Sequence, residues 1–522
     1  MSKIERITKA ATFVTIAVFI SRILGLIREQ VLAYFFGAGK AMDAFVVGYR
    51  IPNLLRDLFA EGALGSAFTK VFTASKEKIG LTTALKEASL VLSNWIIIIS
   101  FFVLLGFLFA PEIVGFIAPA FKEDPKKFQL TIELTRLMMP FLLFISLSAI
   151  FAGLLNSLGV FFIPALSSGV FNLTSILIGV MGYYILLKYS YEPIYAMAFG
   201  VTLGGFFQAF LQFPLLRKRG FFFSLKCNFS SKPFRETLRL ILPVIIGYSA
   251  VQINIFVNTF FATSCGEGAV SWYNYAFRVM YVPLGLFGVG LSQALLPELT
   301  SSLTKGEMSL ARETFAKALT VSLSLSLPSA IGLYFLSEPV IKILFERGKF
   351  LPSDTQMAAA ILQILVISLP FYGISKTSIP LFYALGKTKI PTLGSFLALC
   401  TNLGVILATI KYLGILGVAL GTASSLIVQS FYLLGMTSFY LKKLPYRELL
   451  RSILTFAIAS IFLIFLLIIV ERLVDRLILK LFLSIILGGI IYIIVCRILG
   501  PRETYIFYDQ VLQVFKRRGL NR

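Results

Sequence analysis

Long apolar stretches separated by short polar segments recur along the whole chain. A helix needs about 20 mostly apolar residues to cross the hydrocarbon core of a bilayer, and these stretches reach that length. Hydropathy predicts fourteen such helices, centred near Phe19, Pro52, Ile98, Leu143, Leu173, Gly204, Ile246, Leu286, Leu325, Pro370, Leu397, Leu426, Ile461 and Ile486. The pattern predicts an all-α polytopic membrane protein without a large soluble domain.

The polar segments between these helices form two sets, one for each side of the membrane. The set that contains both termini holds 29 lysines and arginines, and the other set holds 12. Cytoplasmic loops carry the basic excess in membrane proteins, so we expect both termini to be cytoplasmic. The net charge of +23 then follows from topology and from lipid headgroups, and no nucleic-acid partner is expected.

The two halves of the chain share short matches that occur in the same order. The matched sets are Arg50, Phe59 and Gly62 with Arg278, Phe287 and Gly290; Leu158, Gly159 and Pro164 with Leu385, Gly386 and Pro391; and Gly200 and Gly204 with Gly417 and Gly421. Ordered matches at about half the chain length indicate a duplicated transporter architecture. We expect two parallel six-helix lobes around a central cavity, residues 1–220 and 221–441, followed by two extra helices and a tail in 442–522.

Composition restricts the available chemistry. The chain has no histidine, which excludes a His base and a His-ligated metal. Its four cysteines show no CxxC spacing, and Gly386-Lys387-Thr388 lacks the earlier glycine of a P-loop. No cofactor is therefore expected. Three acids, Asp43, Asp57 and Glu61, could hold Mg²⁺ in a membrane-embedded polyprenyl-phosphate enzyme, but their interspersed arginines favour ion pairing.

Twelve charged residues lie inside the predicted helices, where each charge is expensive unless it is paired or faces a wet cavity. They are Arg22, Arg28, Arg50, Arg56, Arg136, Arg278, Lys376, Glu29, Asp43, Asp57, Glu61 and Glu133. Eight of them fall between Arg22 and Glu61. This cluster predicts a polar pathway built around the first two helices.

Helical spacing separates structural charges from candidate substrate-binding ones. Arg50 is seven residues from both Asp43 and Asp57, and Glu133 and Arg136 form an i,i+3 pair, so these charges are expected to be structural. Four arginines, Arg22, Arg28, Arg56 and Arg278, have no acid three or four residues away, and adjacent residues on a helix do not face each other. Guanidinium binds phosphate oxygens with two parallel hydrogen bonds, so this set suits a diphosphate. The alternative is that these side chains snorkel to an interface or brace the lobes.

Several motifs resemble those of the MurJ (MviN) family of lipid II flippases, within the multidrug/oligosaccharidyl-lipid/polysaccharide exporter superfamily. They are Ser21-Arg-Ile-Leu-Gly-Leu-Ile-Arg-Glu29, Phe36-Gly37, Asp43-Ala-Phe45, Ile51-Pro-Asn-Leu-Leu-Arg56, Phe59-Ala-Glu-Gly-Ala63, Ser271-Trp272, Pro283-Leu-Gly-Leu-Phe-Gly288, Leu344-Phe-Glu-Arg-Gly348 and Phe382-Tyr-Ala-Leu-Gly386. The resemblance implies a cationic cavity in which Arg22, Arg28, Arg56 and Arg278 engage the substrate. We expect Glu29, Asp43 and Glu61 to be supporting charges of this cavity. The last two helices would form a groove for the polyprenyl tail.

The resemblance also implies a function and leaves its energy source open. The expected function is movement of undecaprenyl-diphosphate-linked peptidoglycan precursor (lipid II) from the inner to the outer leaflet of the bacterial inner membrane by alternating access. Some family members carry a cation site that uses acids of the seventh and twelfth spans; the resemblance places Asn258 and Ile406 at those positions here, while Asn402, Val418 and Thr422 remain. A residual cation site would therefore comprise Asn258, Asn402, Val418 and Thr422. The loss of both acids weakens the case for sodium coupling, and a monovalent cation or the membrane potential remains the candidate driving force.

Three other functions stay open from the sequence. The first is a related exporter of other lipid-linked oligosaccharides or drugs. The second is the Mg²⁺-dependent enzyme considered above, although a transporter is the favoured reading. The third is a structural partner of wall-synthesis or cell-division proteins, which could accompany transport. Lipid II and membrane lipids are the expected binding partners.

Overall fold

The computed structural model describes residues 3–59, 63–442, 444–501 and 504–505, and the regular structure of these residues is entirely helical. By its internal contacts the chain divides into two compact units. The first comprises Met1–Ser271 with Arg347–Phe350, and the second comprises Trp272–Glu346 with Leu351–Arg522. The all-α prediction is confirmed, and each of the fourteen predicted centres lies within a helix. The repeat boundaries at residues 220 and 441 stay a prediction.

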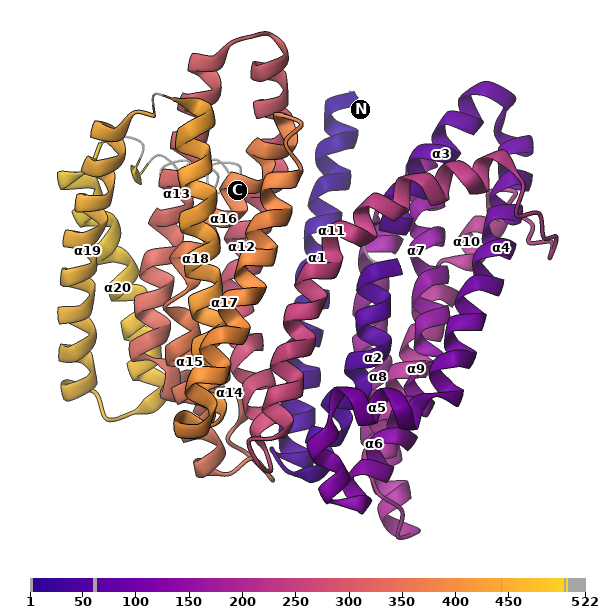
Figure 1. The fold of residues 1–522 in the computed structure, drawn as a ribbon, viewed down its shortest axis with the longest axis horizontal. Coiled ribbons are helices and arrows are strands. Elements are labelled where there is room, and N and C mark those ends of the chain that lie inside the picture. The colour runs from indigo at the N-terminus through magenta and orange to yellow at the C-terminus, as the bar shows by residue number, and fades with distance from the viewer. Residues whose placement is uncertain (1–2, 60–62, 443, 502–503, 506–522) are drawn as a thin grey trace. The chain divides into compact units, whose positions relative to one another are not determined.

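The first unit holds eleven helices and a short 3-10 turn among its described residues (Figure 1). Their bounds are α1 Lys3–Phe36, α2 Lys40–Phe59, α3 Ala63–Ile79, α4 Leu81–Leu108, α5 Ala110–Ile117, η1 Pro119–Glu123, α6 Pro125–Met138, α7 Phe141–Ser157, α8 Phe162–Lys188, α9 Ile194–Phe210, α10 Phe213–Lys218 and α11 Lys232–Thr263. The first turn of α12 also belongs to this unit.

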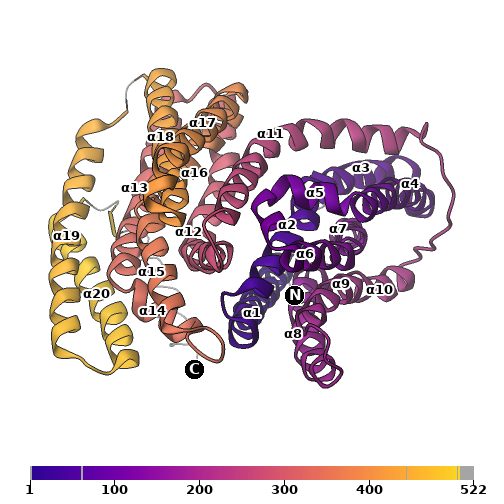
Figure 2. The same cartoon turned by 60° about the horizontal axis from the view of Figure 1, so that its bottom comes forward.

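The second unit contains the rest of α12 and the helices that follow it. Their bounds are α12 Ala269–Thr304, α13 Met308–Phe335, α14 Ser337–Phe345, α15 Pro352–Val366, α16 Leu369–Ala384, α17 Lys389–Leu413, α18 Ile415–Leu441, α19 Tyr446–Leu473 and α20 Leu477–Leu499. The last two helices lie side by side at one edge of this unit (Figure 2).

Several predicted spans consist of two helices instead of one. The span centred on Leu143 combines α6 and α7, which meet at Met139–Pro140, and the span centred on Pro370 combines α15 and α16 with a bend of 45°. Within the described residues, nine spans are long and apolar enough to cross a membrane, and two bent pairs bring the number to eleven. A count of fourteen also requires α1, α2 and α11, and it stays a prediction.

Small residues bring neighbouring helices close together at equivalent positions of the two halves. A Cβ on Gly204 of α9 would lie 2.8 Å from Ser175 Oγ of α8. In α18, a Cβ on Gly421 would lie 2.6 Å from Asn402 Oδ1 of α17. Close backbone approach is the usual basis of helix association in lipid, where apolar burial alone gives no advantage. Gly204 and Gly421, which are matched in the sequence, therefore each allow a close approach to the preceding helix.

The ends of α7 and α16 also correspond. Gly159 and Gly386 follow these helices with φ of 78° and 68°, a left-handed conformation that glycine adopts without strain. After each glycine a backbone N–H reaches back five residues, from Val160 to Leu155 O at 2.8 Å and from Lys387 to Phe382 O at 2.8 Å. This is the hydrogen bond of the Schellman motif, which satisfies carbonyls at a helix end.

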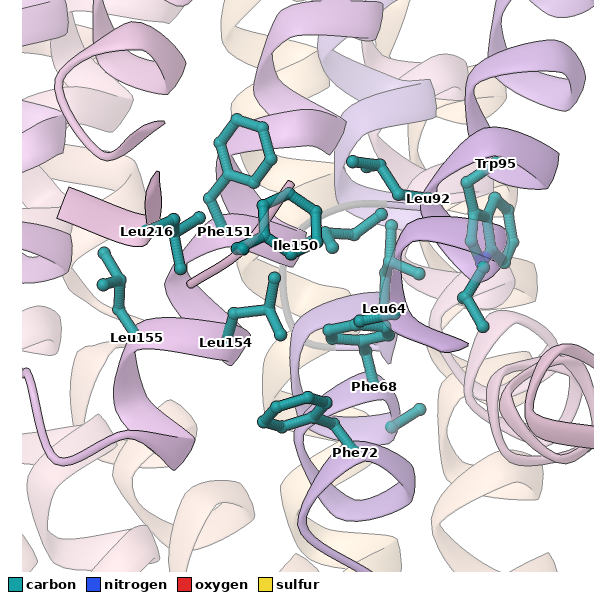
Figure 3. Close-up of a cluster of buried hydrophobic side chains, with 14 of the residues drawn as sticks. Leu64, Phe68, Phe72, Leu92, Trp95, Ile150, Phe151, Leu154, Leu155 and Leu216 are labelled. Carbon is teal, nitrogen blue, oxygen red and sulfur yellow. The ribbon is translucent and has the colours of Figure 1, made fainter. Parts of the chain in front are cut away.

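Aromatic and aliphatic side chains fill the contact between α3, α4 and α7 in the first unit (Figure 3). Phe68 of α3, Trp95 of α4 and Leu154 of α7 are all buried in this cluster. The extended segment between α10 and α11 is held against α4 by hydrogen bonds between its backbone and side chains of α4. Asn94 Nδ2 donates to Asn228 O at 2.8 Å, and Asn228 N donates to Asn94 Oδ1 at 3.0 Å. The segment's polar backbone groups are thereby paired without a strand partner.

Candidate functional site

Arg28 and Glu29 lie in the last third of α1, and both are buried. Arg28 Nη2 donates to Glu29 Oε1 at 2.8 Å, and the guanidinium carbon lies 5.3 Å from the ring centre of Phe171 in α8. Arg28 Nε is also buried but has no hydrogen-bond partner among the described residues. The guanidinium therefore uses few of its five N–H donors within the protein.

Arg56 and Asp57 form a second pair at the end of α2. Arg56 Nε and Nη2 donate to Asp57 Oδ1 at 3.2 and 2.9 Å, and both side chains are partly exposed. The other carboxylate oxygen of Asp57 accepts a hydrogen bond from Gln252 Nε2 of α11 at 3.2 Å. Arg56 is also close enough to Arg28 for their like charges to repel. Helices α1, α2 and α11 thus bring two guanidinium groups into one region of the first unit.

These two pairs correct an expectation from helical spacing. Adjacent residues were expected not to face each other, which excluded Glu29 and Asp57 as partners of the arginines before them. That expectation is wrong for both pairs, because an arginine side chain is long enough to curve sideways around its own helix. The rule describes the directions of Cβ atoms, whereas the guanidinium lies several bonds beyond Cβ.

The remaining two candidate arginines are exposed. Arg22 lies six residues before Arg28 on α1, and Arg278 lies on α12 in the second unit. Helix α1 is held to α8 near Arg22, where Asn172 Nδ2 donates to Ser21 O at 3.2 Å. The substrate-binding role of the four arginines stays a prediction. Glu61, a predicted supporting charge, lies outside the described residues.

Asp43 of α2 is fully buried and is bonded on both carboxylate oxygens. Oδ2 accepts from Lys127 Nζ of α6 and from Gly268 N, both at 2.8 Å. Oδ1 accepts from Ser271 N at 3.0 Å and from Ser271 Oγ at 2.6 Å, in the first turn of α12. This carboxylate is a structural brace in the conformation described, and its ion-pair partner is Lys127 instead of Arg50.

The sequence analysis did not single out Lys127, because it counted this lysine only among the basic residues of the polar segments between the helices. The side chain is buried, and its ammonium also lies 4.0 Å from the ring centre of Phe121. Asp124 Oδ1 accepts a hydrogen bond from Lys127 N at 3.2 Å, which caps α6. Asp124 is a residue type that commonly caps the start of a helix, so the sequence could have indicated that a helix begins here. Lys127 would then have been assigned to the first turn of that helix. Nothing in the sequence indicated its partner 84 residues away.

The expected pair of Glu133 and Arg136 does not form. Glu133 accepts hydrogen bonds from Gln129 Nε2 at 2.7 Å and from the hydroxyl of Tyr195 in α9. Arg136 Nε instead donates to Phe107 O at 3.1 Å, and its guanidinium lies 5.4 Å from the centre of the Phe107 ring. Both residues have structural contacts, as expected, but with other partners.

The residues of the candidate cation site are divided between the two units. Asn258 lies on α11 in the first unit, whereas Asn402 of α17 and both Val418 and Thr422 of α18 lie in the second. Thr422 Oγ1 is 2.9 Å from the hydroxyl of Tyr273 and 3.1 Å from Val418 O. No group of three or more acids, cysteines or histidines that could hold a metal occurs in the described part of the chain. The cation site stays a prediction.

An open cavity of about 770 Å³, with a mixed polar and apolar lining, lies between α3 and α7 in the first unit. Its polar lining includes Ser66, Thr69, Lys70 and Asn156, which surround small residues such as Gly153. The cavity is large enough for a sugar-sized group, and its hydroxyl and amide groups can exchange hydrogen bonds with such a group.

A family model described as lipid II flippase MurJ matches residues 32–488 of the chain. The chain belongs to this family. A protein named probable lipid II flippase MurJ from Buchnera aphidicola subsp. Schizaphis graminum is 32% identical over 509 residues, which cover 95% of this chain and 97% of that protein. The family resemblance found in the sequence motifs is therefore confirmed.

Two solved structures share the fold of this chain. One, titled lipid II flippase MurJ in an inward closed conformation, is 27% identical with a TM-score of 0.78, and the match covers 96% of this chain and 99% of the other. The other is a multidrug resistance MATE family transporter of the MOP superfamily, 16% identical with a TM-score of 0.68, and the match covers 84% of this chain and 99% of the other. The second likeness concerns the fold alone.

Proposed function

We propose that this protein is a flippase for lipid II, which it carries from the inner to the outer leaflet of the bacterial inner membrane for peptidoglycan synthesis. The proposal rests on membership of the MurJ family and is carried structurally by Arg28. A buried arginine with unused N–H donors, close to a second arginine, is suited to bind a diphosphate. The hydroxyl, amide and charged side chains that line part of the cavity between α3 and α7 could replace some of the water around a hydrophilic headgroup, which could not cross bare hydrocarbon without such a replacement.

The polyprenyl tail is assigned to α19 and α20. Both helices expose large apolar side chains, including Ile461 and Phe465 on α19 and Phe482 and Ile485 on α20. A tail in contact with this surface could stay in an apolar environment while the headgroup crosses. The cytoplasmic location of both termini, supported by the excess of basic residues on their side, completes the proposed topology. Two lobes that switch between inward-open and outward-open states would transfer the headgroup, driven by the membrane potential or a monovalent cation.

The decisive experiment is depletion of the protein in cells that depend on it, followed by measurement of lipid II exposed at the outer face. Depletion should strongly reduce this exposure while lipid II accumulates inside. Undiminished exposure would refute the proposal. If another lipid-linked oligosaccharide disappears from the outer face instead, the protein is the related exporter considered from the sequence.

Matched arginine variants test the residues within the same assay. Arg28→Ala and Arg56→Ala should abolish lipid II exposure although the protein reaches the membrane at its normal level. Arg136→Ala is the control, because Arg136 contacts a backbone carbonyl and an aromatic ring outside the proposed site. Equal loss in all three variants would show that the selection of Arg28 and Arg56 is wrong, even if depletion supports the function.

A further inference from the structure

A second polar cavity, of about 470 Å³, lies between α13 and α19 in the second unit. It is lined by the first three turns of α13 and the first two turns of α19, so it lies at one end of two membrane-spanning helices. Its polar lining includes Arg312, Glu313, Lys317, Glu448, Ser309 and Ser452. The cavity is thus built from two cations, two carboxylates and hydroxyl groups.

Arg312 is held in place while most of its donors remain available. Its Nε donates to Leu441 O at 2.6 Å and so caps the C-terminal end of α18. Its terminal amino groups have no hydrogen bond or ion pair among the described residues. A guanidinium fixed through Nε and open at its outer edge is suited to a phosphate group, which accepts two parallel N–H bonds.

The carboxylates occupy the same cavity. Glu448 is exposed and has no ion-pair partner in the part of the chain that the structure describes. Glu313 accepts from Lys317 Nζ at 2.5 Å, but both side chains are more than half exposed. An exposed pair at this spacing contributes only about 0.3–0.5 kcal/mol, so a ligand can replace it. Two acids beside a phosphate-binding arginine disfavour a purely anionic ligand and favour one that also carries a positive charge.

The surroundings of the cavity indicate a lipid. Leu310 on α13 and Tyr446 and Leu450 on α19 are exposed next to the lining residues. Apolar and tyrosine side chains at the end of a span are typical of the interface between headgroups and hydrocarbon. Acyl chains could therefore extend over these side chains while the headgroup enters the polar cavity.

We propose that the cavity between α13 and α19 binds the headgroup of phosphatidylethanolamine, with the phosphodiester on Arg312 and the primary ammonium on Glu448 and Glu313. This site is independent of the proposed lipid II pathway. Phosphatidylcholine should bind less well because its quaternary ammonium donates no N–H bond to the carboxylates. Phosphatidylglycerol should bind less well because it has no positive charge for the two acids.

The test is a titration of the purified full-length protein in detergent with each of these three lipids carrying identical acyl chains, with bound lipid counted by native mass spectrometry. Phosphatidylethanolamine should bind most tightly. Glu448→Gln and Arg312→Gln should each weaken its binding at least about tenfold, the effect of one lost charge-assisted hydrogen bond. Arg451→Gln and Glu471→Gln, on the same helix but outside the cavity lining, should leave it unchanged.

Three results would overturn the proposal. They are equal binding of phosphatidylglycerol, unchanged binding in Glu448→Gln, or equally tight binding of free phosphoethanolamine, which would indicate a site for a soluble ligand. Should Arg312→Gln fail to fold because α18 loses its cap, Glu448→Gln decides the matter, since Glu448 supports no described contact. Loss of lipid II transport in these variants is not required, so failure here and failure of the proposed function are distinguishable.

Discussion

Replacement of Asp43 by asparagine should destabilise the protein strongly. The substitution removes the negative charge that faces Lys127 Nζ at 2.8 Å and places an amide where four donors now converge. Because Lys127 is itself buried, it would remain as an uncompensated cation. Removal of one partner from a buried pair typically lowers the free energy of unfolding by about 3–5 kcal/mol, more than a hundredfold in the ratio of folded to unfolded protein.

Lys127→Met should be less harmful than Asp43→Asn. In this variant the Asp43 carboxylate keeps its hydrogen bonds from Gly268 N, Ser271 N and Ser271 Oγ. Hydrogen bonds to a charged group each contribute about 1.5–3 kcal/mol to the free energy of unfolding. The double variant should be at least as stable as Asp43→Asn alone, because the methionine removes the uncompensated cation. Coupling energies of about 0.5–3 kcal/mol are usual for residues in contact.

Thermal melting of the purified variants in one detergent measures this order. The expected melting temperatures rise from Asp43→Asn to Lys127→Met to the natural chain, with the double variant not below Asp43→Asn. Simple additivity, in which the double variant melts lower than either single variant by the sum of their shifts, would refute the interpretation of Asp43 and Lys127 as one buried pair.

Three further outcomes follow from the described contacts. Arg28→Lys should abolish complementation at a normal membrane level, since one ammonium cannot hold Glu29 and also offer the spread of N–H groups of a guanidinium. Gly421→Ala should lower the melting temperature through a loss of about 1–3 kcal/mol by overpacking, whereas Gly435→Ala, with no atom within 4 Å, should not. The hydrogen bond from Lys40 lowers the pKa of Asp124, so the stabilisation by its carboxylate is complete above the unfolded pKa of about 3.9 and is lost as the pH falls through the lower folded value. The difference in melting temperature between the natural chain and Asp124→Asn should accordingly be constant near neutral pH and disappear in acid.

The sequence was sufficient to predict the helical fold, because a chain that crosses hydrocarbon must satisfy its backbone groups within each segment. It did not predict where the spans break. Hydropathy averages over many residues, so the join between α6 and α7 was hidden within one apolar maximum. Pro140 at this join lacks a backbone N–H, and a reading of prolines together with hydropathy would have indicated the interruption.

The site was predicted less completely than the fold. Composition and spacing identified the charged residues inside the spans, but the partners of a charge depend on contacts between distant segments. Asp43 pairs with a lysine of α6, and Glu133 bonds to Tyr195 of α9 instead of to the arginine one turn away. Sequence spacing ranks only partners on the same helix, and in both cases a residue of another helix was bound.

The adjacent acids also change how the arginines should be understood. Arg28 without a partner would be a bare charge inside the first unit, and such a charge opposes insertion of α1 into the membrane. Glu29 removes most of that penalty while it accepts only one of the five N–H groups. A diphosphate could then bind the unused donors without displacing the acid. The presence of an acidic neighbour is therefore compatible with a substrate-binding role for Arg28, because it allows the arginine to stay buried when no substrate is bound.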